Sequence, residues 1–69
     1  MDVASNLKSI RTLRRYTQED IAEVLNITQQ QYSRYEVGVH DIPIRYAIIL
    51  CKFYGISADW LLGLKETME

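Results

Sequence analysis

The sequence predicts an all-α domain of five short helices, and three observations support this fold class. Apolar residues recur at spacings of three and four, which is the period of an amphipathic helix. Only one proline and three glycines interrupt the 69 residues, and the alternation typical of strands is absent. Residues that cap helix N-termini precede several of the apolar segments. A chain of this length forms one domain with a modest core.

We expect the helices at residues 3–15, 18–25, 29–36, 43–54 and 58–62. Thr17 and Thr28 are the expected N-caps of the second and third helices, each with a capping-box partner three residues later. Asn26 tolerates the left-handed conformation that ends a helix sharply, so a three-residue turn joins these two helices. Pro43 fits the first turn of the fourth helix, where its missing N–H costs nothing. Residues 1–64 form the domain, and residues 65–69 are expected to be a short, frayed C-terminal tail.

Composition limits the classes of protein to which the chain can belong. Cys51 has no second cysteine to pair with and lies in an apolar run, so we expect it to be a buried hydrophobe. The longest apolar run is too short to span a bilayer, and no signal peptide is recognisable, so we expect a soluble cytoplasmic protein. With one histidine, His40, and one cysteine, the chain offers no catalytic or metal-binding constellation, and we expect no enzyme activity, metal or cofactor.

The net charge of −1 does not by itself indicate nucleic-acid binding. Basic residues cluster early in the chain, at Lys8, Arg11, Arg14 and Arg15, and acidic residues follow at Glu19, Asp20 and Glu23. We expect most of these charged side chains to lie on the solvent-exposed surface. The third helix has a more distinctive surface. Apart from its apolar anchors, Tyr32 and Tyr35, this helix presents consecutive amides and a guanidinium, and it has no acid before Glu36: Gln29, Gln30, Gln31, Ser33 and Arg34.

Residues 17–30 resemble the helix-turn-helix of the lambda-repressor-like family, which includes Cro and the Xre-type regulators. The resemblance continues through residues 32–38, 41–43 and 57–63, and therefore covers nearly the whole chain. Two departures are visible. Asn26 stands where the family usually has glycine, and the segment Val39-His40-Asp41 lacks the cations that are frequent there.

The resemblance implies that the third helix lies in the major groove of DNA and that Gln18 meets the backbone. Both roles are physically reasonable, because a helix N-terminus favours phosphate and glutamine can form two hydrogen bonds with adenine. The expected DNA-binding residues are Gln18, Thr28, Gln29, Gln30, Gln31, Ser33 and Arg34. Gln31 has an alternative role as the capping partner of Thr28. Candidate contacts to the DNA backbone are Arg11, Arg14 and Arg45.

The resemblance also implies an ion pair between Arg11 and Glu36 that sets the angle of the third helix against the core. Near the C-terminus, Trp60, Leu61 and Leu64 either complete the core or form part of a dimer surface, and both roles can hold together.

From these features we expect a transcriptional regulator, and more specifically a repressor, that binds double-stranded DNA in a sequence-specific way. Because one domain reads only a few base pairs, we expect a homodimer on a pseudo-palindromic operator. The alternative is an antitoxin-like module that uses the same fold to hold a protein partner. The pI of about 5.7 favours this alternative, whereas the polar face of the third helix does not.

Overall fold

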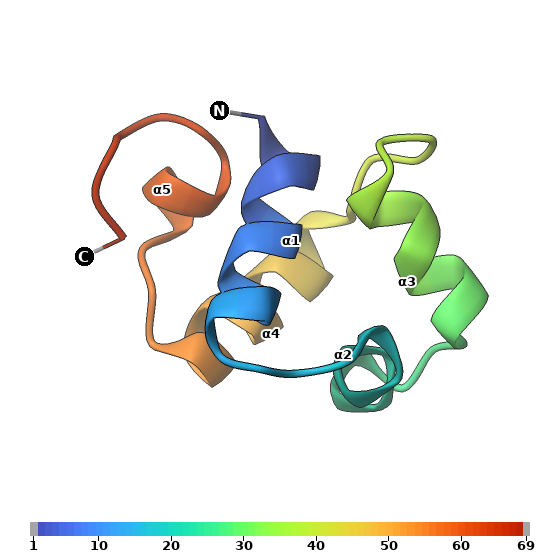
Figure 1. Ribbon diagram of the computed structural model, residues 1–69. Coiled ribbons are helices and arrows are strands. Elements are labelled where there is room, and N and C mark those ends of the chain that lie inside the picture. The colour runs from blue at the N-terminus through green and yellow to red at the C-terminus, as the bar shows by residue number, and fades with distance from the viewer. Residues whose placement is uncertain (1, 69) are drawn as a thin grey trace.

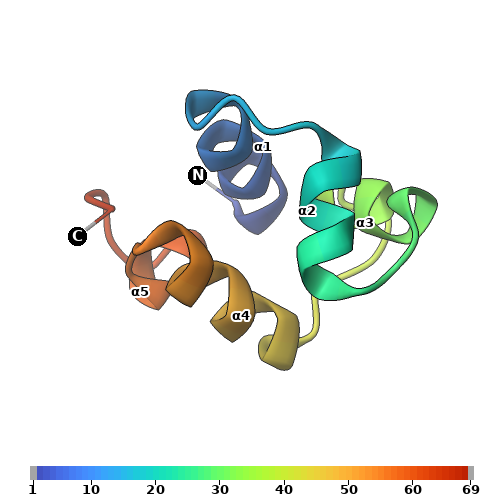
Figure 2. The same cartoon turned by 90° about the horizontal axis from the view of Figure 1, so that it is seen from below.

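The computed structural model describes residues 2–68, which contain five helices and no strand (Figure 1). The helices are α1 (Val3–Leu13), α2 (Gln18–Leu25), α3 (Gln29–Glu36), α4 (Ile44–Tyr54) and α5 (Ala58–Leu61). α1 lies in the centre, with α3 at one end of the molecule and α5 at the other (Figure 1). Seen from below, α4 lies along one side, between α5 and α2 (Figure 2). The all-α fold with five helices is thus confirmed.

Three helix boundaries differ slightly from the prediction. α1 ends at Leu13, and the chain then turns away because Arg15 adopts a left-handed conformation with φ 63°. α4 begins at Ile44, because Pro43 is its N-cap, with an extended ψ of 145°, and not a residue of its first turn. α5 ends one residue earlier than expected, at Leu61.

The turn between α2 and α3 is formed by the capping residues and the left-handed asparagine that the sequence predicts. Thr17 and Thr28 cap the two helices, and each takes part in a complete capping box, with Asp20 and Gln31 as the respective partners. Asn26 ends α2 with φ 57° and ψ 43°, the left-handed conformation that asparagine tolerates. Only three residues, 26–28, therefore separate α2 from α3, and the two helices must cross steeply.

The core lies between α1, α2 and α4, and α5 closes it. Leu13, the last residue of α1, is exposed, whereas Cys51 is buried as expected. Burial raises the pKa of the Cys51 thiol. The buried apolar residues are Leu7, Ile10, Ile21, Ala22, Leu25, Tyr32, Ala47, Leu50, Cys51, Tyr54, Trp60 and Leu61.

The segment after α5 folds back onto the domain. The carbonyl of Met68 accepts a hydrogen bond of 2.7 Å from the amide of Ser57, and the Met68 side chain packs against the core. This arrangement differs from the frayed tail that we expected, because the apolar Met68 has a surface to cover. Glu69 lies outside the described residues. α5 is also held to α1, where Asn6 Nδ2 donates to the carbonyl oxygen of Trp60 at 2.9 Å.

An ion pair between Arg11 of α1 and Glu36 at the end of α3 joins the two helices. Arg11 Nε lies 2.6 Å from Glu36 Oε2, and Nη2 lies 3.0 Å from Oε1, so the contact is bidentate. Nη1 of the same guanidinium donates to the carbonyl of Tyr16 at 2.8 Å, which ties the turn before α2 to this point. The two side chains are only 12% and 2% exposed.

This environment shifts the titration of both partners. Burial raises the pKa of the Glu36 carboxyl, but hydrogen bonds from Arg11 and Gln18 outweigh it, and the pKa lies below its ordinary value. The hydrogen bond to Glu36 raises the pKa of Arg11. The pair is therefore fully ionised at neutral pH.

We predict that Ala22→Leu lowers the free energy of unfolding by about 1–3 kcal/mol, because the larger side chain does not fit in the packed core that Ala22 of α2 faces. Ala22 is buried in the core. Urea denaturation measures the effect, and Ala58→Leu, the same change at an exposed alanine of α5, is the matched control. An unchanged unfolding midpoint for Ala22→Leu would refute tight packing of the core around Ala22.

We predict that Glu36→Ala lowers the free energy of unfolding by about 3–5 kcal/mol, because it leaves the Arg11 charge poorly solvated and unpaired. Glu23→Ala, at an exposed position of α2, is the control and should change it by no more than about 0.5 kcal/mol. Urea denaturation at neutral pH compares the two variants.

The same pair predicts a dependence on pH. Because the pKa of Glu36 is lower in the folded chain, its stabilisation is complete above the ordinary carboxyl pKa of about 4.3 and is lost as the pH falls through the folded-state value. The difference in unfolding free energy between the parent and Glu36→Gln should therefore shrink below about pH 4. A difference that stays constant from neutral pH to acid would contradict this.

Candidate nucleic-acid interface

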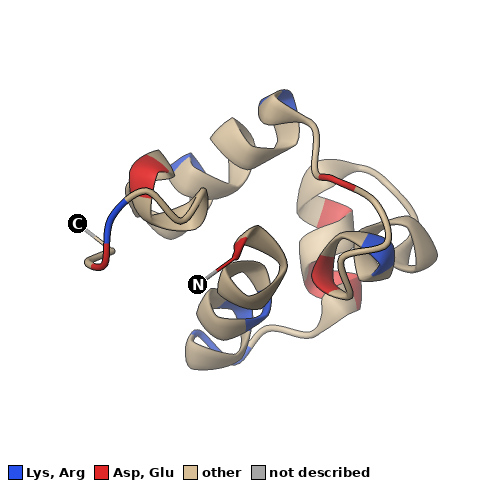
Figure 3. Ribbon diagram, turned by 90° about the horizontal axis from the view of Figure 1, so that it is seen from above, with Lys and Arg blue, Asp and Glu red and all other residues tan. Residues whose placement is uncertain are grey.

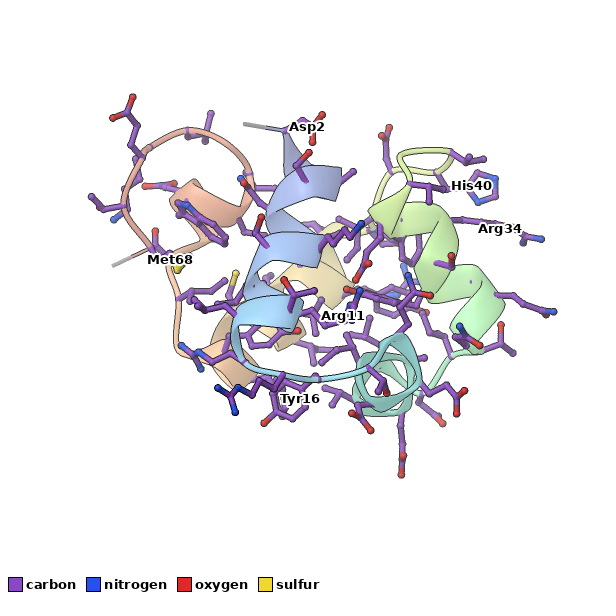
Figure 4. All side chains as sticks on the ribbon, in the orientation of Figure 1. Asp2, Arg11, Tyr16, Arg34, His40 and Met68 are labelled. Atoms are coloured by element: carbon purple, nitrogen blue, oxygen red, sulfur yellow. The ribbon has the colours of Figure 1, made fainter. Side chains whose placement is uncertain are left out.

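α3 presents a polar face to the outside of the molecule. Gln29, Gln30 and Gln31 are exposed, Ser33 is half-buried, and the Arg34 side chain extends away from the body of the protein (Figure 4). Only two residues of α3, Tyr32 and Glu36, are buried. Together with Tyr35, which is half-buried and packs against the core, these two residues anchor the helix, and the amide side chains and Arg34 remain exposed.

A chain of hydrogen bonds runs from the ion pair to this polar face. Gln18 Nε2, in the first turn of α2, donates to Glu36 Oε1 at 3.1 Å. Gln29 Nε2, in the first turn of α3, donates to Gln18 Oε1 at 3.2 Å. The N-terminal ends of both helices are thus linked to each other and, through Glu36, to Arg11. Sequence reasoning found the ion pair but missed these two amide contacts, for which no local sequence signal exists.

The contacts leave specific hydrogen-bonding groups unused. An amide side chain has two N–H donors and one oxygen acceptor. Gln29 uses one N–H, so its oxygen and its second N–H face solvent. Gln18 uses its oxygen and one N–H, and one N–H remains. An acceptor and a donor side by side on Gln29, and a lone donor on Gln18, are therefore available.

Gln31 is held by the N-cap of α3. Its Oε1 accepts from the amide of Thr28 at 3.0 Å and lies 3.3 Å from the Thr28 hydroxyl, which in turn accepts from the Gln31 amide at 3.2 Å. Of the two roles weighed for this residue, the capping role is the one seen in the structure. Gln31 has only its side-chain N–H groups left for a ligand, and Thr28 has its hydroxyl committed to the cap.

The buried anchor Tyr32 lies beside the ion pair. Burial, together with the nearby Glu36 carboxylate, raises the pKa of its hydroxyl far above the ordinary value. Within residues 2–68 no hydrogen bond of acceptable geometry reaches this hydroxyl. Tyr32 is therefore neutral, and its buried ring fixes α3 on the core.

The candidate backbone contacts differ in how available they are. All three guanidinium nitrogens of Arg11 already donate within the protein. Arg45 is exposed at the start of α4, with its guanidinium 4.6 Å from the centre of the Tyr46 ring. Arg14 is exposed at the end of α1, 6.0 Å from the centre of the Tyr54 ring. Arg14 and Arg45 are therefore exposed to solvent, whereas the donors of Arg11 are committed to contacts within the protein.

Charge is distributed unevenly around the site. Figure 3 shows basic residues on α3 and α4 and acidic residues on α2. The loop after α3 adds no lysine or arginine: Val39, His40 and Asp41 are all exposed there. Two loop amides, those of Val39 and His40, donate to the carbonyl of Arg34 and close the end of α3. Attraction for an anionic ligand is thus local, around Arg34 and Arg45.

Two of the residues considered for a dimer surface belong to the core. Trp60 and Leu61 are 6% and 0% exposed, and only Leu64 is largely exposed, at 73%. Among the described residues, no group of His, Cys, Asp and Glu could hold a metal ion. None of the helices in this part of the chain is both long and apolar enough to cross a membrane.

Comparison with known proteins gives consistent results. The sequence pattern of the helix-turn-helix family matches residues 7–61, which include Arg11, α2, α3 and α4. The SPbeta prophage-derived uncharacterized HTH-type transcriptional regulator YonR of Bacillus subtilis is 38% identical over 56 residues, which are 81% of this chain and 52% of YonR. The antitoxin PezA of Streptococcus pneumoniae is 28% identical over 61 residues, 88% of this chain and 39% of PezA.

The fold also matches a crystal structure of a transcriptional regulator from Listeria innocua, with a TM-score of 0.87 and 25% sequence identity. The match covers 99% of this chain and 64% of that one. This chain spans about half the length of several curated relatives. Because the family pattern covers most of the chain, including the two capped helices and their three-residue turn, the protein belongs to the helix-turn-helix family.

Proposed function

We propose that this chain is a sequence-specific DNA-binding regulator, acting in the cytoplasm as a repressor, that reads the major groove with α3. The observation that carries the proposal is the hydrogen-bond chain from Arg11 through Glu36 and Gln18 to Gln29. It orients the first residues of α2 and α3 before any ligand binds. Groups that are held in place lose little conformational entropy on binding, which favours affinity.

The unused groups of Gln29 match a base edge. Adenine presents the N7 acceptor and the N6 amino donor in the major groove, and a glutamine oxygen with an adjacent N–H pairs with both. The contact between Gln29 and Gln18 leaves this pair of groups free. Gln30, the next exposed amide, and Arg34 are the further candidate base contacts, together with Ser33. Gln31 contributes through its N–H groups alone.

The remaining N–H of Gln18 suits a phosphate. Gln18 is the first residue of α2, where unpaired backbone amides and the positive end of the helix dipole favour an anion. Arg45 and Arg14 add positive charge from α4 and from the end of α1. Because one domain reads few base pairs, a homodimer on a pseudo-palindromic operator completes the proposal.

A second candidate function is an antitoxin-like module that holds a protein partner. The similarity to the antitoxin PezA favours it, as does the acidic α2 surface. A protein-binding α3 would be expected to offer an exposed apolar anchor, and its exposed residues are instead amides and an arginine. We therefore propose DNA binding ahead of binding to a protein partner, and selection from random DNA distinguishes the two functions.

We predict that selection of bound duplexes from a random DNA pool at moderate salt recovers an inverted repeat. The half-site centres should lie about 10 base pairs apart, one helical turn, because a two-fold dimer presents its two recognition helices at that spacing. Sequencing of the bound fraction measures this. Enrichment of no sequence, with weak residual binding that salt abolishes, would favour the protein-partner function instead.

Single substitutions on the selected operator should separate base contacts from phosphate contacts. Gln29→Ala and Gln30→Ala should each weaken operator binding by about 1–3 kcal/mol and relax the preference at one position. Gln18→Ala should weaken binding to all sequences alike, because a phosphate contact carries no sequence information. Lys8→Ala, an exposed change on α1, is the control. Titration of labelled duplexes gives the affinities, and unchanged operator binding by both Gln29→Ala and Gln30→Ala would refute the docking of α3.

A further inference from the structure

A pocket of about 250 Å³ lies where the start of α1, the end of α3 and the loop after α3 meet. For comparison, a cavity of about 150 Å³ can hold one benzene ring. The pocket, which we call the α1–α3 pocket, therefore has room for a ring or a branched alkyl group with a short polar arm. Most of its lining is apolar: Val3, Ala4, Tyr35, Gly38, Ile42 and Leu62.

The loop that forms one wall of the pocket is held against both helices. The amides of Val39 and His40 donate to the carbonyl of Arg34 at 3.0 and 3.2 Å, which fixes the loop on the end of α3. Gly38 adopts a left-handed conformation with φ 81°, and a Cβ atom there would lie 3.7 Å from the Cβ of Ala4 in α1. The loop therefore runs close to α1, and the wall of the pocket is formed before any ligand binds.

His40 and Asp41 complete the lining, and both are exposed to solvent. Within residues 2–68, the Asp41 carboxylate has no hydrogen-bond or ion-pair partner. None of the residues that line the pocket is a lysine or an arginine. An apolar pocket with a few polar groups suits a ligand that has an apolar body and one oriented polar group. Here the group that would orient the ligand is an unpaired carboxylate.

The charges around the pocket favour a cation. Figure 3 shows an acidic residue at the start of α1 and another in the loop after α3. Asp2 caps α1, and the hydrogen bond from the Ser5 amide lowers the pKa of its carboxyl, so its negative charge offsets the positive end of the helix dipole. The C-terminal end of α3, which carries the negative end of its dipole, also borders the pocket. Arg34 of α3 extends away from the body of the protein (Figure 4).

We infer that the α1–α3 pocket binds a small organic amine. The ring or branched alkyl body of the amine lies against the apolar lining, and its ammonium group, which is protonated at neutral pH, pairs with the Asp41 carboxylate. The inference goes beyond the proposed function and does not depend on it, because no contact with DNA enters the argument. The ligand would contact both α1 and Tyr35 of α3, and so would bind directly beside the helix that we propose reads DNA.

A larger pocket of about 490 Å³ beside α5 gives a useful comparison. Its lining includes Trp60 and Leu64, and it also includes one basic and one acidic residue, Lys65 and Glu66. Because these two charges have opposite signs, they favour neither a cationic nor an anionic ligand. The α1–α3 pocket is therefore the one whose charge selects a class of ligand, and the pocket beside α5 shows where an apolar compound would bind without that selection.

The test titrates the DNA-free protein with compounds that share one apolar body and differ in charge: 2-phenylethylamine, 2-phenylethanol and 3-phenylpropionate. Amide signals in two-dimensional NMR spectra at neutral pH report where each compound binds and how tightly. The amine should shift the amides of residues 38–42 and saturate at millimolar concentration, as expected for so small a ligand. The alcohol should bind about two- to fivefold more weakly, which is the contribution of an exposed ion pair, and the anion more weakly still.

Two variants separate the contribution of charge from that of space. Asp41→Asn should lower the affinity for the amine to that for the alcohol and leave the affinity for the alcohol unchanged. Asp59→Asn, the same change at an exposed position of α5, is the matched control and should behave as the parent. Ala4→Leu places a larger side chain in the pocket and should weaken binding of the amine and the alcohol alike. Thermal unfolding confirms that each variant is folded.

Each contrary outcome overturns the inference in a recognisable way. Equal affinity for all three compounds would show that charge selects no ligand. Shifts confined to residues 63–66 would place the binding site in the pocket beside α5. A preference for the amine that survives Asp41→Asn would remove the carboxylate from the site, and shifts that never saturate would mean that no site exists. Because DNA is absent from the titrations, failure of the proposed DNA binding would be detected separately, in the selection from random duplexes.

Discussion

The ion pair between Arg11 and Glu36 is the constraint on which the recognition surface depends. α3 is eight residues long, too short to be stable alone, and its position comes from what it packs against. Its two buried residues, Tyr32 and Glu36, are one turn apart and lie on one line. One anchor is thus a charged residue in a nearly dry site. The direction of the helix depends on the bidentate contact with α1 as much as on apolar burial.

A charged anchor has a consequence that an apolar one would lack. Glu36 accepts hydrogen bonds from Arg11 and from Gln18, and Gln18 in turn accepts from Gln29. Through the Glu36 carboxylate, the position of α1 therefore fixes the side chains of Gln18 and Gln29 at the N-terminal ends of α2 and α3. An apolar pair at positions 11 and 36 together could support α3 equally well in energetic terms, since replacing both partners of a buried ion pair by apolar packing is often neutral or stabilising. It could not orient an amide.

Much of this fold is predictable because its signals are local. Threonine caps with partners three residues later, and Asn26 at the end of α2, determine a short turn whatever the rest of the chain does. The features that escaped prediction depend on distant parts of the chain. The contacts of Gln18 and the return of Met68 onto Ser57 arise from the relative placement of whole helices. Pro43 was misplaced by one residue because proline suits both the N-cap and the first turn.

α4 shows a different limit of sequence reasoning. Its residues are apolar on nearly every side, so the spacing that distinguishes a buried stripe from an exposed one is lost. Both Leu50, which is fully buried, and Ile49, which is not, satisfy the pattern. Only the placement of α4 against α1 and α2 shows which of its faces the domain leaves uncovered.

The small net charge of the protein limits how strongly it can attract DNA without regard to sequence. Non-specific affinity for DNA comes from cations that neutralise phosphates, and this chain has a net charge of −1 with acids on α2. In the proposed function, contacts with phosphates therefore contribute little affinity, and discrimination comes from the oriented groups at the ends of α2 and α3. Because a single domain with few phosphate contacts binds even its own half-site weakly, the proposed homodimer adds affinity where two half-sites coincide.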